Sequence, residues 1–319
     1  MIRTRFTERF DLDHPIALAP MDQVSGGRLA AAVSNAGGLG ILGGGYADPD
    51  WLAAELDKAG NARVGVGFIT WAALETPAGA EAALVRDPAA LMVSFGDAEP
   101  LVEAAKAASV PVLWQVQRLE QARQALAAGA DALVVQGQEA GGHGMDRGLI
   151  ALLPAVRDLA GPETILLGAG GVADGRGLAA ALSLGADGVL MGTRFWASRE
   201  AQGPDSAKQA LLRAGGDDTV RSKVFDVARD VNWPWHFSGR VVRNAFLNRW
   251  HDDIDGLRAS PEAAAAYAAA DPEDYDTRVL IAGEALDLID DLPPAAEIVE
   301  RTSAEAEAIL RSPPRATLG

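Results

Sequence analysis

The segment GAGGVADGRGLAAALSLGADGVLMGTRFWAS, residues 168–198, carries the pattern that decides the fold. An apolar run over 165–168 leads into a glycine-rich turn at 168–171, and an alanine-rich segment with helical spacing follows. A second apolar run over 188–192 then ends in a Gly-Thr pair. Two short buried strands joined by a helix lie parallel to each other, so this segment predicts one unit of a parallel α/β sheet.

Apolar runs alternate with helical segments eight times between residue 15 and about residue 200. These runs are short and apolar on both faces, as strands of a covered parallel sheet are. They lie at residues 16–20, 39–43, 64–69, 91–95, 112–116, 132–136, 165–168 and 188–192. Only the connection over 71–90 has a weak helical pattern, because Pro77 and Gly79 interrupt it. Eight such units predict an α/β fold of the (β/α)8 TIM-barrel class.

An open, doubly wound sheet is the alternative fold. It requires a phosphate-binding turn between the first strand and the first helix, and the sequence MDQVSGGRLA at 21–30 does not provide one. The stretch GLGILG at 38–43 has the letters of a dinucleotide-binding motif. However, Leu39, Ile41 and Leu42 lie inside it, so it is typical of a strand.

The pattern changes beyond about residue 200, where no strand is evident. Alanine-rich acidic segments predict helices at 205–214, 261–270, 279–289 and 303–311, and the tail over 311–319 is expected to be loosely ordered. We therefore predict a barrel domain over 1–200, which a late helix is a candidate to close, and a C-terminal helical appendage over 201–319 on the substrate side. The aromatic stretch 231–251 is expected to bury an interface, against the barrel mouth or a second copy in a homodimer.

Composition excludes several classes of protein. The 319 residues carry 28 Lys and Arg against 44 Asp and Glu, and a net charge of −16 repels nucleic acid and anionic membrane surfaces. The absence of cysteine excludes disulfides, thiolate nucleophiles and iron–sulfur clusters, and no two of the four histidines have metal-ligand spacing. With no apolar leader or membrane-length run evident, we expect a cytoplasmic protein without a bound metal.

Two glycine-rich strand ends are the first candidate site. In a TIM barrel, the working face lies at the carboxyl ends of the strands. The seventh predicted strand ends in Gly170-Gly171 and the eighth in Gly192-Thr193. Backbone N–H groups without a Cβ nearby, together with helix N-termini, bind phosphate without lysine. We therefore predict that these two turns hold a phosphate.

The loop after the sixth strand is the second candidate site. It runs from Gln136 to Met145 and contains His143, the one histidine within the barrel repeats. Histidine exchanges protons near neutral pH, and the flanking glycines give it little packing support, which favours a functional role. Glu139 in the same loop is either a partner that orients His143 or a solvated charge.

These residues resemble the FMN-dependent nitronate monooxygenase family, also known as 2-nitropropane dioxygenases. The matching stretches are PIALAPM (15–21), SNAGGLGILGGG (34–45), VGVGFITW (64–71), QGQEAGGHG (136–144), the segment 168–198, and WPWHFSGRVVRN (233–244). The resemblance implies a TIM barrel that binds FMN and oxidises alkyl nitronates with O2 to carbonyl compounds and nitrite.

The resemblance also implies roles for individual residues. His143 matches the family's active-site histidine, which acts as a base or stabilises an anion. The remaining positions would contact the cofactor, with the phosphate on the two glycine turns: Pro20, Met21, Asp22, Gly67, Gln115, Gln136, Gly141, Gly142, Gly170, Gly171, Gly192 and Thr193.

Three positions depart from the family pattern. Gly67 stands where many members have asparagine, Gly144 stands where arginine often follows the histidine, and Asp22-Gln23 replaces small residues. The departures leave the substrate open. The same barrel and loops also serve NAD(P)H-dependent flavin reductases of quinones or enoyl thioesters, which is the alternative function, and fold alone does not decide between them. A flavin-binding protein without turnover is a further alternative.

Overall fold

Eight parallel strands form the barrel that the sequence predicts. The computed structural model describes residues 1–312, so most of the expected loose tail lies outside the described residues. The strands are β1 (Ile16–Leu18), β2 (Ile41–Gly45), β3 (Gly65–Ile69), β4 (Leu91–Ser94), β5 (Val112–Val116), β6 (Ala132–Gln136), β8 (Ile165–Ala169) and β9 (Gly188–Met191). They pair in the order β1-β9-β8-β6-β5-β4-β3-β2, and a bridge between Ala17 and Leu39 links the two end strands. The doubly wound alternative is therefore excluded.

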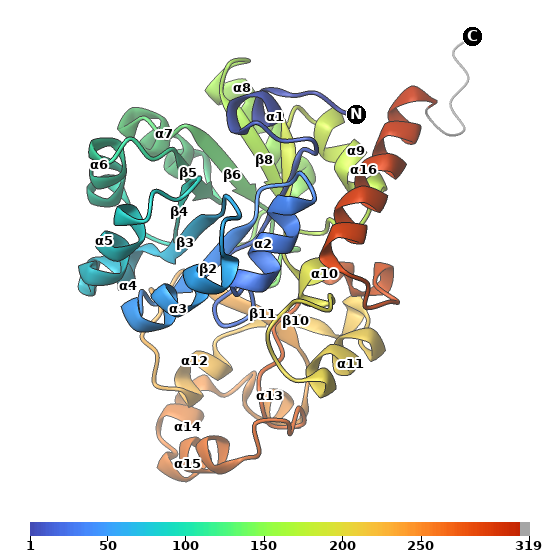
Figure 1. Cartoon of the computed structure of the whole chain (residues 1–319). Helices are drawn as coiled ribbons and strands as arrows, with labels where there is room; N and C mark the ends of the chain where they lie inside the picture. The colour runs from blue at the N-terminus through green and yellow to red at the C-terminus, as the bar shows by residue number, and fades with distance from the viewer. Residues whose placement is uncertain (313–319) are drawn as a thin grey trace.

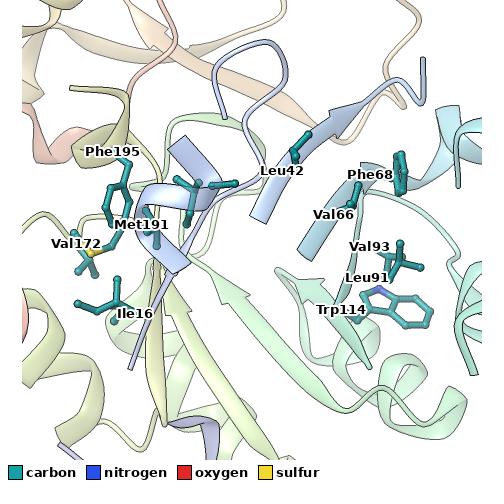
Figure 2. Packing of buried hydrophobic residues seen from close by; sticks show 14 of the residues in the cluster. Ile16, Leu42, Val66, Phe68, Leu91, Val93, Trp114, Val172, Met191 and Phe195 are labelled. Carbon is teal, nitrogen blue, oxygen red and sulfur yellow. The ribbon is translucent and has the colours of Figure 1, made fainter. Parts of the chain in front are cut away.

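Alternate residues of each strand pack on opposite sides of the barrel wall. In β4, Met92 belongs to the apolar cluster inside the barrel, whereas Leu91 and Val93 pack outward under the helices. Figure 2 shows this outer layer, in which Val66 and Phe68 of β3 lie with the same outward-facing group. Burial on both faces explains why the strands are continuous apolar runs.

Helices surround the barrel on its outside (Figure 1). They are α2 (Gly27–Asn35), α3 (Pro49–Ala59), α4 (Thr70–Glu75), α5 (Pro77–Val85), α6 (Glu99–Ala107), α7 (Leu119–Ala128), α8 (Leu149–Ala160), α9 (Gly175–Ser183) and α10 (Thr193–Trp196). Pro77 explains the weak helical pattern over 71–90, because it divides the connection and begins α5 as its first residue. After β9, the helix α10 has only 4 residues, too few to cover the last strand.

Two terminal helices complete the barrel. The late helix α16 (Ala295–Arg311) packs along α9 and also against α2, where the outer ring would otherwise be open (Figure 1). His14, which precedes β1, also contacts α16, because its Nδ1 lies 2.8 Å from the Ser303 hydroxyl. At the amino end of the strands, α1 (Arg5–Phe10) places Phe6 and Phe10 in the inner apolar cluster.

The segment between the barrel and α16 differs from the prediction, because it contains strands. Its elements are α11 (Asp205–Arg213), η1 (Gly216–Asp218), β10 (Thr219–Ser222), α12 (Val224–Ala228), β11 (Ser238–Val242), α13 (Ala245–Trp250), α14 (Ile254–Arg258), α15 (Pro261–Ala269) and η2 (Glu284–Leu288). The strands β10 and β11 pair antiparallel with each other, and β11 pairs with β7 (Gly142–Gly144) from the histidine loop.

The predicted helix over 279–289 is also wrong. Ile281 forms an isolated bridge to Val241 of β11, in the small sheet made of β10, β11 and β7. Only the short η2 follows it. These strands form because they pair with a distant loop, a tertiary contact that overrides local helical spacing.

We keep the domain division near residue 200 as a proposal. Among the described residues, no helix is long and apolar enough to cross a membrane.

Candidate active site

A cavity of about 350 Å³ lies at the carboxyl ends of the barrel strands, between the barrel and the segment that carries β10 and β11. Every candidate site residue from the sequence lines it, from Pro20 after β1 to Thr193 after β9. Residues that were not candidates close it from the appended side, namely Arg229, Trp233, Ile281, Gly283 and Ala285. One barrel face therefore brings together residues that are far apart in the sequence.

The ends of β1 and β3 meet on one side of the cavity. A Cβ added to Gly67 would lie 2.4 Å from the Cβ of Pro20. Such contacts do not occur without a shift, so the proline ring takes the space that a side chain at position 67 would need. A side chain at this position, such as asparagine, would therefore require Pro20 to move.

Glutamine side chains line the wall formed by β5 and β6. The Gln136 Oε1 accepts hydrogen bonds from the Nε2 of Gln117 at 2.6 Å and of Gln115 at 3.4 Å. All three side chains are buried. Because its oxygen is engaged, the Gln136 amide presents its NH2 group as the remaining donor, which suits a carbonyl or ring nitrogen of a ligand.

The turn after β8 has the backbone that the sequence predicts. Gly170 and Gly171 have φ angles of +102° and +72°, in the range that favours glycine. A Cβ on Gly170 would lie 3.0 Å from the backbone nitrogen of Ala140. Within residues 1–312, no backbone carbonyl accepts from the N–H groups of Gly170, Gly171 or Gly192. These N–H groups are therefore free to bind an anion.

The amino end of α9 does not support the expectation that helix N-termini contribute to phosphate binding. The Asp174 carboxylate accepts from the N–H groups of Arg176 and Gly177 at 2.9 and 3.2 Å. Glu305 of α16 accepts from the N–H of Gly175 at 2.8 Å. Two carboxylates already satisfy this helix end, so an anion would contact the glycine turns and not α9.

The strand β7 holds His143 over the cavity. His143 pairs in register with Gly239 of β11, and its side chain is 10% exposed. Trp233 stacks on the imidazole with ring centroids 3.4 Å apart and an interplanar angle of 4°. Phe95 contacts the imidazole edge-on at 6.4 Å. The ring is therefore fixed between aromatic side chains, unlike the unsupported loop residue that the flanking glycines indicated.

Asp226 of α12 is the partner of His143. Its two carboxylate oxygens lie 3.1 and 3.0 Å from the His143 Nε2. The hypothesis that Glu139 orients the histidine is wrong, because Glu139 accepts from the N–H of Leu149 at 2.9 Å and caps α8. Nothing in the local sequence KVFDVARD, 223–230, marks Asp226, since only the pairing of β7 with β11 brings it close.

Burial lowers the pKa of His143 below its usual value of 6.5, although Asp226 opposes this shift through its hydrogen bond and its charge. The cations of Arg229 and Arg221 lower it further. The imidazole is therefore neutral at neutral pH, and a neutral imidazole can accept a proton.

Two arginines of the small sheet hold the backbone of the histidine loop. The Nε groups of Arg221 and Arg240 both donate to the carbonyl of Gln138, at 3.2 and 2.9 Å. Burial lowers the pKa of Arg221 to about 10, so it still carries its charge at neutral pH. The strands β10 and β11, which were not predicted from the sequence, thus position the predicted loop that carries His143.

Comparison with known proteins identifies the family and the fold of this chain. The family model for nitronate monooxygenase matches residues 3–64 and 69–305. A nitronate monooxygenase from Neurospora crassa is 33% identical over 92% of this chain and 89% of its own length. Among solved structures, FabK from Thermotoga maritima has a TM-score of 0.84 at 28% identity, covering 98% of both chains. Nitroalkane oxidase from Streptomyces ansochromogenes has a TM-score of 0.76 at 27% identity, covering 96% of this chain and 99% of its own.

Proposed function

We propose a function from the premise that this chain belongs to the nitronate monooxygenase family and is an oxidoreductase. The proposal is that it oxidises alkyl nitronates with O2 to carbonyl compounds and nitrite, using FMN. One observation carries it: a single cavity combines free glycine N–H groups for an anion with a neutral imidazole held against an aromatic wall.

The residues present fit FMN. The cavity volume is within the range of small-molecule sites, and its glycine turns leave N–H groups for the phosphate without a lysine. Gly170, Gly171, Gly192 and Thr193 would hold that phosphate. The ring system would lie among the remaining cofactor candidates: Pro20, Met21, Asp22, Gly67, Gln115, Gln136, Gly141 and Gly142. When bound, FMN would supply the electron transfer between nitronate and O2, and the protein would supply position and charge.

His143 acts on the substrate in this proposal. A nitroalkane becomes a nitronate when its α-proton is removed, and the neutral imidazole in the cavity can accept that proton. The lowered pKa favours this base role over the other role that the resemblance left open, a charged imidazolium that holds the anion. Trp233 and Phe95 exclude water from one side of the imidazole.

Oxygen uptake tests the proposal. Purified protein loaded with FMN receives a preformed nitronate without NADH, and O2 consumption and nitrite release are followed together. We expect nitrite to form as O2 is consumed. The second candidate, an NAD(P)H-dependent flavin reductase of a quinone or an enoyl thioester, predicts turnover only when NADH and such an acceptor are present, so that result would replace the first proposal.

Asp22 provides a prediction about charge. Part of the Asp22 side chain is open to solvent, but its place in the cavity wall removes much of its hydration. This desolvation raises the pKa of Asp22 to about 6, and the positive charge of Arg229 opposes the shift. Above that pH the carboxylate repels an anionic nitronate. In Asp22→Asn, we expect the KM for a nitronate above pH 6 to fall roughly two- to fivefold, with little change below pH 6.

The control for this prediction is Asp97→Asn, because Asp97 also follows a barrel strand but does not line the cavity. Steady-state kinetics on both sides of pH 6 provide the measurement. An unchanged dependence of KM on pH in Asp22→Asn would show that this carboxylate does not face the substrate.

Two further expectations stay proposals, a cytoplasmic location and a homodimer. Within the aromatic stretch, Trp233 and Phe237 pack against Phe95 at the barrel mouth, whereas Trp235 is 82% exposed. An interface with a second copy would therefore use the face that carries Trp235. Comparing the sedimentation coefficients of the native protein and of Trp235→Ser would test whether that face forms a dimer.

A further inference from the structure

We propose that Asp226 is a positioning residue for His143. Its carboxylate accepts a hydrogen bond from the Nε2–H group, so that Nδ1 carries the lone pair that removes the α-proton of a neutral nitroalkane. This inference rests on the proposed function and deepens it, because it assigns the reacting atom and names the side chain that selects that atom.

The contact itself fixes the tautomer. A carboxylate accepts hydrogen bonds and does not donate them, and both oxygens of Asp226 lie within 3.1 Å of Nε2. The side chains of His143 and Asp226 are only 10% and 9% exposed, so water does not compete for the contact. Nε2 therefore carries the hydrogen, and Nδ1 of the neutral ring is unprotonated.

The second ring nitrogen is left for the substrate. Within residues 1–312, Nδ1 makes no hydrogen bond, and it is not fully buried. It is therefore the ring nitrogen left to contact a ligand, on a ring that lines the cavity. A small second void, lined by Asp226, Arg229 and Gly239, also borders the ring.

The surrounding side chains keep the ring in this orientation. Trp233 covers one face, and the indole Nε1 donates to the Tyr46 hydroxyl at 3.1 Å, which fixes the indole in turn. Arg229 pairs with Asp226 at 3.3 Å and donates from its Nε to the Phe225 carbonyl. A carboxylate held by both a cation and an imidazole N–H has little freedom to turn away.

The proton transfer balances without another reactant. The bond between Cα and hydrogen breaks, its electron pair stays on the nitro compound as the nitronate, and the proton binds Nδ1. The ring becomes an imidazolium, and the adjacent Asp226 carboxylate stabilises that charge, as in other carboxylate–histidine pairs. A preformed nitronate bypasses this step, so Asp226 should not affect its oxidation.

The first test is the tautomer of the wild-type protein, which requires no turnover. In ¹⁵N-labelled protein above the pKa of the ring, we expect His143 to show an unprotonated Nδ1 and a protonated Nε2. Nuclear magnetic resonance distinguishes the two nitrogens by their shifts, with His143→Asn to assign the signal. A protonated Nδ1 would overturn the proposal.

The second test compares Asp226→Asn with Asp230→Asn, the same chemical change four residues later on an exposed side chain. We expect Asp226→Asn to lower kcat/KM for a neutral nitroalkane about 10- to 100-fold, with nitronate oxidation unchanged. Asp226→Glu, which keeps a carboxylate, should recover part of the loss. Equal losses on the two substrates would contradict a role in proton transfer.

The pH profile separates positioning from a merely structural role. The charged groups that face His143 are Asp226 and Arg229 from α12 and Arg221 from β10. Asp226→Asn removes the one negative charge among them, so the acid limb of the pH profile of kcat/KM should move to lower pH. An acid limb that stays in place would count against the proposal. Failure of the proposed function would appear differently, as a wild-type protein that does not oxidise nitronates at all.

Discussion

Replacing His143 by asparagine should reduce kcat/KM for neutral nitroalkanes by about 10²- to 10⁴-fold, the usual contribution of a general base. Oxidation of preformed nitronates should fall far less, because the α-proton is already gone. The imidazole lines the cavity and is neutral at neutral pH, so its loss removes a proton acceptor and not a binding charge. Parallel steady-state assays on a nitroalkane and its nitronate, at one pH, measure this difference.

His14→Asn is the matched control. His14 precedes β1 at the opposite end of the barrel and contacts Ser303 of α16. This variant should retain both activities. The base role would be wrong if His143→Asn lost both activities equally while still binding FMN, because that outcome fits a histidine that holds the anion.

Gly170→Val should give the second large effect, a loss of FMN affinity. The φ angle of +102° disfavours a side chain, and the new Cβ would lie 3.0 Å from the Ala140 nitrogen. Strain of about 1–3 kcal/mol would displace the turn, which corresponds to roughly 5- to 150-fold weaker binding. Fluorescence titration of the flavin-free protein with FMN measures the affinity.

Gly161→Val provides the matched control for strain. Gly161 also has a positive φ, +76°, but it lies between α8 and β8 at the opposite end of the barrel, and nothing lies within 4 Å of an added Cβ. This variant should lose stability but bind FMN with wild-type affinity. If both variants bound FMN like the wild type, the phosphate would not contact the turn after β8.

Much of the barrel could be predicted from the sequence, because its signal is local. Each strand is buried on both faces, so it is a short apolar run, and glycine-rich turns follow β8 and β9. For the same reason the candidate residues could be found, since a strand end in a TIM barrel is already a position on the working face. Their gathering in one cavity follows from barrel closure.

The remaining part of the site depends on contacts between distant segments. Asp226 lies 83 residues from His143, and its role depends on β11 pairing with β7, a strand of three residues made of glycine and histidine. Such a strand has no alternating apolar pattern to detect. Trp233 was visible as part of an aromatic stretch, but only the fold shows that it stacks on the imidazole.

The most direct test of the central claim is the visible spectrum of the purified, FMN-loaded protein during anaerobic addition of a nitronate. We predict that the absorption of the oxidised flavin decreases as nitronate is added and returns when O2 is admitted, without NADH. A protein that binds no flavin, or a bound flavin that responds to NADH and not to a nitronate, would contradict the account.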